Sequence, residues 1–153
     1  MMPPRFYVDT SVFGGVADSE FEKASRRFFD LIRIGAFDLV VSPSVIDELG
    51  PAPNAVREKW VEVAPWAEIC EVTPEALELQ QAYLDAGVLT PKWEEDALHV
   101  ALATVSRCHA IVSWNFRHIV NFRKIPRYNE VNKEKGYPTI AIYSPLEIVP
   151  NED

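Results

Sequence analysis

Apolar residues along this chain follow two patterns, short continuous runs and longer stretches in which they recur every third or fourth position. The short runs are bounded by glycine, proline and polar residues, which is typical of buried strands. The longer stretches indicate amphipathic helices. The sequence therefore predicts strands that alternate with helices. The predicted strands are 6–8, 37–41, 67–72, 110–113 and 139–143.

Capping and stop signals set the ends of the predicted helices. Ser19 and Glu22 have capping-box spacing at the start of the first long helix, and Gly35 follows its last apolar turn. Ser42 and Thr73, each followed by proline, are expected to begin two further helices. The segment after the first strand contains a pair of glycines and is expected to turn the chain. The predicted helices are 21–34, 43–49, 54–64, 74–86 and 94–103, followed by a basic helical segment after residue 115.

Strands that alternate with helices favour an α/β fold, because each connecting helix packs on a face of a parallel sheet. We therefore predict a three-layer α/β/α sandwich with a central parallel sheet, a Rossmann-like architecture. At 153 residues the chain is long enough for one hydrophobic core, and it contains no repeat or linker. We expect a single domain over residues 1–149, with 150–153 as a frayed C-terminus.

The net charge of -8 and the pI near 4.9 count against a nucleic-acid partner, because phosphate binding usually requires a basic surface. The distribution of charge changes this interpretation. Residues 115–137 contain six basic and two acidic side chains, a local charge of +4. Taken alone, such a run is most often a solvated helix face.

The chain lacks the features of a membrane or secreted protein. No stretch approaches the roughly 20 apolar residues that span a bilayer, and the first residues contain no signal-peptide core. We therefore expect a cytoplasmic protein without a membrane partner. Cys70 and Cys108 have neither CxxC spacing nor a cluster of ligands nearby, so we expect two reduced, buried thiols.

Three acidic residues are expected at the carboxyl edge of the predicted sheet, where open α/β sheets bind ligands. Asp9 ends the first strand, Glu48 lies on the helix after the second, and Asp96 lies early in the helix before strand 110–113. Each has an ordinary alternative, as a turn former or N-cap, a solvated helix residue, or a first-turn charge. Carboxylates at close range repel one another and raise each other's proton affinity, so such a cluster usually requires a cation. Oxygen ligands favour Mg²⁺ or Mn²⁺ over zinc.

Segments around these acids resemble the acidic motifs of PIN domains, including the VapC toxins of bacterial toxin-antitoxin pairs. They are Tyr7–Val12, Ser42–Leu49 and Asp96–Ala103, and Val112–Ile119 resembles one bacterial subgroup. Together the motifs extend over nearly the whole chain. The resemblance implies an α/β/α sandwich and a Mg²⁺- or Mn²⁺-dependent endoribonuclease that cleaves single-stranded or structured RNA. It also implies a homodimer that an antitoxin protein keeps inactive.

The resemblance assigns roles to the acidic residues. Asp9 and Asp96 are expected to bind the metal, and Glu48 to complete the metal shell or orient the attacking water. Many PIN domains have a fourth acid where this chain has Asn115, whose amide oxygen can bind a cation but brings no charge. The expected catalytic residues are therefore Asp9, Glu48, Asp96 and Asn115, and we expect one well-held ion.

Hydroxyl groups form a second set of candidates close to the acids in the sequence. Their hydroxyls are expected either to hold a metal-bound water or a phosphate, or to make turn and cap hydrogen bonds. These residues are Thr10, Ser11 and Ser113. His99 lies on a largely apolar helix and is expected to be a packed residue rather than a base.

The basic segment gains a function beside a nuclease site, since its cations would guide a phosphate backbone toward an acidic centre. The expected RNA-binding residues are Arg117, His118, Arg123, Lys124 and Arg127. His118 is expected either to contact phosphate or to support Asn115. Trp114 and Tyr128 are candidates for stacking on bases, with a core position as the alternative for Trp114.

Two other classes of protein compete with this interpretation. The first is a PIN-fold RNA- or protein-binding domain whose catalysis is weak or lost because Asn115 replaces an acid. The second is a phosphohydrolase of haloacid-dehalogenase type, which also begins with a strand-terminal Asp. That family requires a second Asp two residues later, where this chain has Ser11. No glycine-rich dinucleotide or P-loop motif indicates a nucleotide cofactor.

Overall fold

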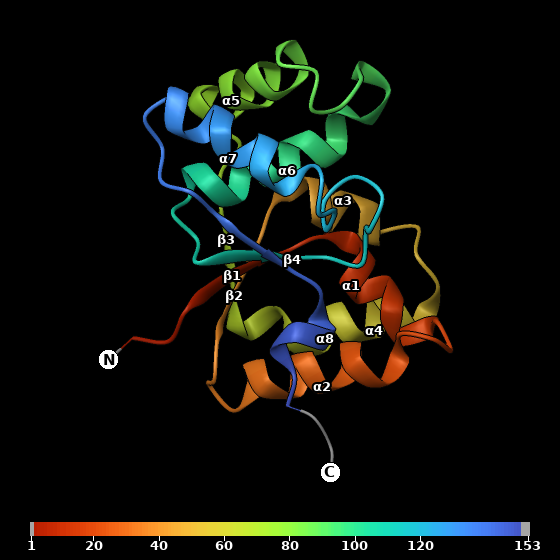
Figure 1. Cartoon of the computed structure of the whole chain (residues 1–153). Coiled ribbons are helices and arrows are strands. Elements are labelled where there is room, and N and C mark those ends of the chain that lie inside the picture. Colours follow the sequence, from red (N-terminus) through yellow and green to blue (C-terminus); the bar gives the residue numbers. More distant parts are fainter. Residues whose placement is uncertain (1, 151–153) are drawn as a thin grey trace.

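The central element of the fold is a sheet of five parallel strands within residues 2–150, in the order β3-β2-β1-β4-β5. The structure is a computed structural model that describes residues 2–150, so most of the predicted frayed end, 150–153, lies outside the described residues. Helices cover both faces of the sheet, which confirms the predicted α/β/α sandwich (Figure 1). The strands are β1 (Arg5–Val8), β2 (Asp38–Val41), β3 (Ala67–Ile69), β4 (Ala110–Val112) and β5 (Ala141–Tyr143).

The central strands are buried because helices cover both of their faces. Tyr7 and Val8 in β1 are fully buried, as are Val40 in β2 and Ile111 in β4. In the strand register, Tyr7 pairs with Val40 on one side and Ile111 on the other. The residue after β1, Asp9, therefore leaves the sheet at its centre.

Two groups of helices form the outer layers. In Figure 1, α5, α6 and α7 lie above the sheet, and α2, α4 and α8 lie below it. Contacts agree with this arrangement, since α5 packs on α6 and α7, whereas α2 packs on α4 and α8. The helices are α1 (Thr10–Gly14), α2 (Glu22–Arg33), α3 (Pro43–Leu49), α4 (Asn54–Val63), α5 (Pro74–Asp85), α6 (Glu94–Val105), α7 (Ile125–Glu134) and α8 (Pro145–Ile148), with 3-10 helices η1 (Gly15–Ala17), η2 (Ala64–Trp66) and η3 (Pro91–Trp93).

Side-chain caps begin two helices as predicted. Ser42 caps α3 and Thr73 caps α5, each accepting a backbone N–H from the residue three positions later. The capping box predicted at Ser19 is wrong. α2 begins after Phe21 without a side-chain cap, because Asp18 closes the preceding turn by accepting a backbone N–H at 2.8 Å.

The segment after β1 is helical, so the predicted turn is wrong. Gly14 ends α1 and Gly15 begins η1, and both have right-handed helical φ values, -57° and -58°. The helical conformation buries Val12 and Phe13 completely, which stabilises it over an exposed turn. As a result Asp9 occupies the N-cap position of α1, at the carboxyl end of β1.

The outer strands are shorter than predicted. β3 ends at Ile69 because its partner β2 ends at Val41, whose carbonyl accepts the N–H of Cys70 at 2.9 Å. β5 begins late because the N–H of Ile140 donates to the side chain of Asn129 at 2.8 Å instead of to the sheet.

The structure also bears on the expected lack of a membrane span and on the two cysteines. Within residues 2–150, no helix has both the length and the apolar character needed to cross a membrane. Cys70 and Cys108 are both free, and Cys70 is buried as predicted, but Cys108 is partly exposed, so the prediction of a buried thiol is wrong for Cys108.

Candidate active site

The three predicted acidic residues lie around the carboxyl edge of the sheet. β1 lies between β2 and β4, so residues that follow these three strands are neighbours in space. Asp9 follows β1, Glu48 lies near the end of α3, and Asp96 lies in the first turn of α6. Burial is the main cause of the raised pKa of Asp9 and of Asp96. The charge of Asp96 adds to the shift at Asp9, and the charge of Glu48 adds to the shift at Asp96. The structure therefore brings the three charges within electrostatic reach of one another.

Asp9 is a buried carboxylate held by two serine hydroxyls. Its side chain is 4% exposed, Ser11 Oγ donates to Oδ1 at 2.6 Å, and Ser113 Oγ donates to Oδ2 at 2.6 Å. Burial raises the pKa of Asp9, although the His99 charge and both hydroxyls oppose this shift. The carboxylate is thus fixed in one orientation while its negative charge is poorly solvated.

The same two serines join the ends of β1 and β4. Ser11 Oγ accepts the backbone N–H of Trp114 at 2.8 Å, and Ser113 Oγ accepts that of Asn115 at 2.9 Å. Ser113 makes a turn hydrogen bond as predicted, whereas Ser11 bonds to a residue 103 positions away, and both serines contact Asp9. Their predicted role toward a metal-bound water or a phosphate stays a prediction. The third hydroxyl candidate, Thr10, donates to Glu48 Oε2 at 2.7 Å.

Glu48 is oriented by His99 and Thr10. His99 Nε2 lies 3.5 Å from Glu48 Oε1, and the hydrogen bond with His99 is the main reason that the pKa of Glu48 is lowered. His99 Nδ1 lies 2.7 Å from the hydroxyl of Tyr7, which lies 2.8 Å from Ser42 Oγ. A buried series of polar contacts thus runs from Ser42 through Tyr7 and His99 to the exposed carboxylate of Glu48.

His99 is packed, as predicted, but it is also a functional candidate that the sequence interpretation missed. Burial lowers its pKa, but the hydrogen bond with Glu48 and the charges of Asp9 and Asp96 outweigh burial, so the pKa is raised overall. The signal in the sequence was its spacing: His99 lies three residues after Asp96, on the same face of α6.

Replacing His99 with Gln is expected to raise the pKa of Glu48 toward its ordinary value of 4.5, because the imidazole hydrogen bond, the main cause of the lowered pKa, is lost together with the positive charge of His99. The measurement is a pH titration of the Glu48 side-chain carbonyl by NMR in metal-free buffer. His109, for which no contact with the acids exists in the described structure, provides the control as His109→Gln. An unchanged Glu48 titration in His99→Gln would contradict the proposed pairing.

Asp96 lies beside Asn115 and His118. Burial raises the pKa of Asp96, whereas the charge of His118 and a hydrogen bond from the Asn115 amide lower it. The Asn115 oxygen accepts the backbone N–H groups of Arg117 at 3.2 Å and His118 at 2.9 Å. This oxygen is therefore engaged with the backbone instead of being free to bind a cation.

The donor chemistry of the site fits a hard divalent cation. Asp9 and Asp96 supply carboxylate oxygens, and the raised pKa of each, caused mainly by burial, shows an uncompensated negative charge that a cation would neutralise. Within residues 2–150, however, no group of three or more His, Cys, Asp or Glu side chains is positioned to hold a metal ion. The predicted three-carboxylate ligand set is not assembled in this structure, because Glu48 is held by His99 and Thr10.

The predicted RNA-binding residues lie in different surroundings. Only the second half of the basic segment is helical, as α7. Lys124 Nζ donates to the Val88 carbonyl at 3.3 Å, and Arg127 donates to the carbonyls of Ala86 and Gly87 at 3.2 and 3.0 Å. These two cations therefore bind carbonyls at the C-terminal end of α5, a favourable place for positive charge.

The remaining members of that set are Arg117, His118 and Arg123. Arg117 and Arg123 are exposed, whereas His118 is 7% exposed and neither of its ring nitrogens has a hydrogen-bond partner within the described chain. Trp114 and Tyr128 are both buried in the core, which is the alternative predicted for Trp114 and which makes the predicted base stacking by Tyr128 wrong.

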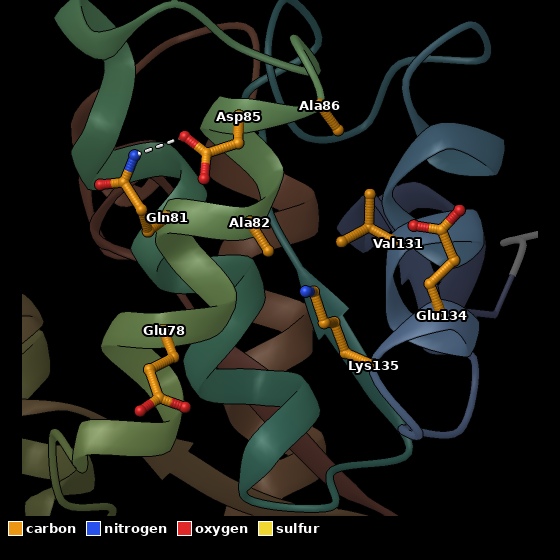
Figure 2. Close-up of a pocket in the computed structure, with 8 residues that line it drawn as sticks. All are labelled: Glu78, Gln81, Ala82, Asp85, Ala86, Val131, Glu134 and Lys135. Atoms are coloured by element: carbon orange, nitrogen blue, oxygen red, sulfur yellow. Dashed lines mark hydrogen bonds between the residues drawn. The ribbon is translucent and has the colours of Figure 1, made fainter.

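A separate groove on the surface lies between α5 and α7 (Figure 2). None of the predicted catalytic residues lines it, and a hydrogen bond of 2.8 Å from Gln81 to Asp85 lies along one wall. The groove is therefore distinct from the candidate active site. Its lining residues are Glu78, Gln81, Ala82, Asp85, Ala86, Val131, Glu134 and Lys135.

Comparison with solved structures shows that the chain has the fold of VapC-type PIN domains. One similar structure is VapBC2 from Rickettsia felis bound to a DNA fragment from their promoter, with 13% identity, a TM-score of 0.58, and coverage of 92% of this chain and 98% of that chain. Another is the sarcin-ricin loop cleaving toxin VapC20 of Mycobacterium tuberculosis, with 14% identity, a TM-score of 0.52, and coverage of 89% and 98%. No protein-family model and no curated protein sequence matches the chain.

Proposed function

We propose that this protein is a Mg²⁺- or Mn²⁺-dependent endoribonuclease of the VapC type, which cleaves single-stranded or structured RNA. The observation that carries this proposal is the pair of partly or fully buried carboxylates, Asp9 and Asp96, at the carboxyl edge of a VapC-like sheet. One similar structure is described as a toxin that cleaves the sarcin-ricin loop, which supports RNA as the substrate.

The residues of the site have distinct roles in the proposed reaction. Asp9 and Asp96 would hold the ion, and the hydrogen bonds from Ser11 and Ser113 fix the Asp9 carboxylate for this task. When bound, the ion supplies Lewis acidity toward a phosphoryl oxygen and lowers the pKa of water. Glu48, whose pKa is lowered chiefly by its hydrogen bond with His99, stays ionised, and its oxygens accept a hydrogen bond from the attacking water.

An antitoxin protein and a second copy of the chain are the proposed partners. Support for the antitoxin comes from the similar structure described as VapBC2 bound to a DNA fragment from their promoter. The second copy is what the resemblance to VapC toxins implies. In this proposal the protein is the toxin of a toxin-antitoxin pair, and the antitoxin restrains its nuclease activity.

A second candidate function is a PIN-fold domain that binds RNA or protein without efficient catalysis. The observations that favour it are Asn115 in place of an acid, with its oxygen engaged by two backbone N–H groups, and the absence of a preassembled three-ligand metal group in the described residues. The two candidates differ in whether metal-dependent turnover occurs.

The test compares Asp96→Asn with Glu95→Gln in an RNA cleavage assay. Glu95 is an exposed neighbour in the same first turn of α6, so its variant controls for loss of one negative charge. We expect wild type and Glu95→Gln to cleave RNA with Mn²⁺ or Mg²⁺ and to stop when EDTA is added. Asp96→Asn is expected to be slower by about 100-fold or more. Undiminished cleavage by Asp96→Asn, or cleavage in EDTA, would refute the mechanism.

A further inference from the structure

Next to Asp96 lies a cluster of one aromatic ring, two cations and one unpartnered imidazole. Trp93 ends η3, three residues before Asp96. Lys92 Nζ lies 5.1 Å from the centroid of the Trp93 ring, and the Arg117 guanidinium carbon lies 5.3 Å from it. Two positive side chains from separate segments therefore meet at one indole in a chain whose net charge is -8.

His118 packs against the same indole. The centroids of the Trp93 and His118 rings are 4.3 Å apart with an interplanar angle of 31°. His118 is 7% exposed, and both ring nitrogens lack a hydrogen-bond partner within residues 2–150. An unpartnered buried polar side chain costs free energy, and such groups are uncommon unless a ligand, ion or water completes them.

The chemistry of this cluster matches that of a nucleotide. A flat, partly exposed indole binds a base by stacking, and cations near it bind the phosphate attached to that base. Lys92 and Arg117 are both exposed, so their long side chains are free to move from the ring face to a phosphate. The unpartnered imidazole of His118 lies against the same ring.

We propose that Trp93, Lys92 and Arg117 form a nucleotide subsite beside Asp96, in which Trp93 stacks on a base of single-stranded RNA and the two cations bind the adjacent phosphate. This inference rests on the proposed function, because it places the subsite next to the scissile phosphate. Stacking is largely independent of base identity, so the subsite selects unpaired RNA over duplex RNA rather than one sequence.

The experiment measures binding of a short fluorescein-labelled single-stranded RNA by anisotropy in EDTA, so that no cleavage occurs. Trp93→Leu keeps an apolar side chain against His118 but removes the stacking surface, and Trp93→Phe restores a smaller aromatic face. Trp66→Leu is the matched control, since Trp66 is an exposed tryptophan at the end of η2. Circular dichroism and thermal unfolding confirm that each variant is folded.

We expect Trp93→Leu to bind about 5- to 100-fold more weakly and Trp93→Phe to recover part of this loss, with Trp66→Leu unchanged. An oligonucleotide with abasic positions should bind wild type and Trp93→Leu equally. Lys92→Ala and Arg117→Ala should each reduce the slope of log affinity against log salt concentration by about 1, because each removes one phosphate contact. Equal affinity of wild type and Trp93→Leu for intact RNA would overturn the subsite. So would a loss of affinity in Trp93→Leu that is as large for abasic RNA as for intact RNA.

Failure of the subsite is distinguishable from failure of the proposed function. If wild type cleaves RNA but Trp93→Leu changes neither the affinity nor KM, the nuclease stands and the subsite falls. If wild type binds RNA through Trp93 but never cleaves it, the subsite stands and the nuclease falls. If wild type does not bind RNA at all, both are refuted.

Discussion

Asp9→Asn is expected to reduce metal-dependent RNA cleavage by about a thousandfold or more, because the proposed metal ligand would supply several kcal/mol of transition-state stabilisation. The same variant is expected to be more stable than wild type in EDTA. Burial raises the pKa of the Asp9 carboxyl, which means that the buried negative charge destabilises the metal-free protein. The Asn oxygen can still accept one of the two serine hydroxyls, and its amide N–H can donate to the other hydroxyl oxygen, without that charge.

The sign of the pH dependence follows from this shift. Because the folded state holds the Asp9 proton more tightly than the unfolded chain, folded protein binds more protons from about the ordinary pKa of 3.8 up to the raised folded value. The contribution of Asp9 to stability therefore falls as pH rises through that interval. The gap in unfolding free energy between Asp9→Asn and wild type should widen over the same interval.

Urea unfolding at several pH values in EDTA measures that gap, and thermal unfolding with Mn²⁺ measures metal binding. Wild type should be stabilised by about 2.7 kcal/mol when Mn²⁺ is present at 100 times its dissociation constant, whereas Asp9→Asn should respond much less. A variant that is inactive but less stable than wild type at neutral pH would contradict the electrostatic interpretation of Asp9.

Gly15→Ala is expected to destabilise the protein by about 2–4 kcal/mol. A Cβ atom at this position would lie 2.3 Å from Ser25 Oγ and 2.7 Å from Trp114 Nε1. Those two atoms form a buried hydrogen bond of 2.8 Å, and Ser25 Oγ also donates to the carbonyl of Val12 at 2.8 Å. The added methyl group would separate α2 from the segment that carries Ser113 and Asn115.

Gly14→Ala is the matched control, because the adjacent glycine has open space where the Cβ would lie. Its φ of -57° is compatible with alanine, so this variant should be more stable than wild type by about 0.4–1 kcal/mol. Chemical denaturation of both variants, with tryptophan fluorescence as the probe, checks the pair. Similar stabilities for the two variants would show that the packing around Gly15 is looser than described.

Much of the site was predictable because it depends on where strands end. An apolar run followed by a polar residue marks the carboxyl end of a buried strand, which is how Asp9 and Ser113 were found. The orientation of Asn115 was not predictable, since its oxygen could equally well have faced a metal. The hydrogen bonds of Lys124 and Arg127 to carbonyls after α5 were also unpredictable, because a run of charged residues in a sequence does not show which carbonyls lie beside it.

The sequence by itself determined the alternation of strands and helices, the buried centre of the sheet and the position of Asp9 at its edge. These features follow from periodicity, since the free energy of burying apolar side chains acts on each segment separately. Only the tertiary structure decided which polar groups meet. Ser113 and Asp9 are 104 residues apart, and His99 and Tyr7 are 92 residues apart. No local pattern records such pairs, because their contact depends on how whole strands and helices pack.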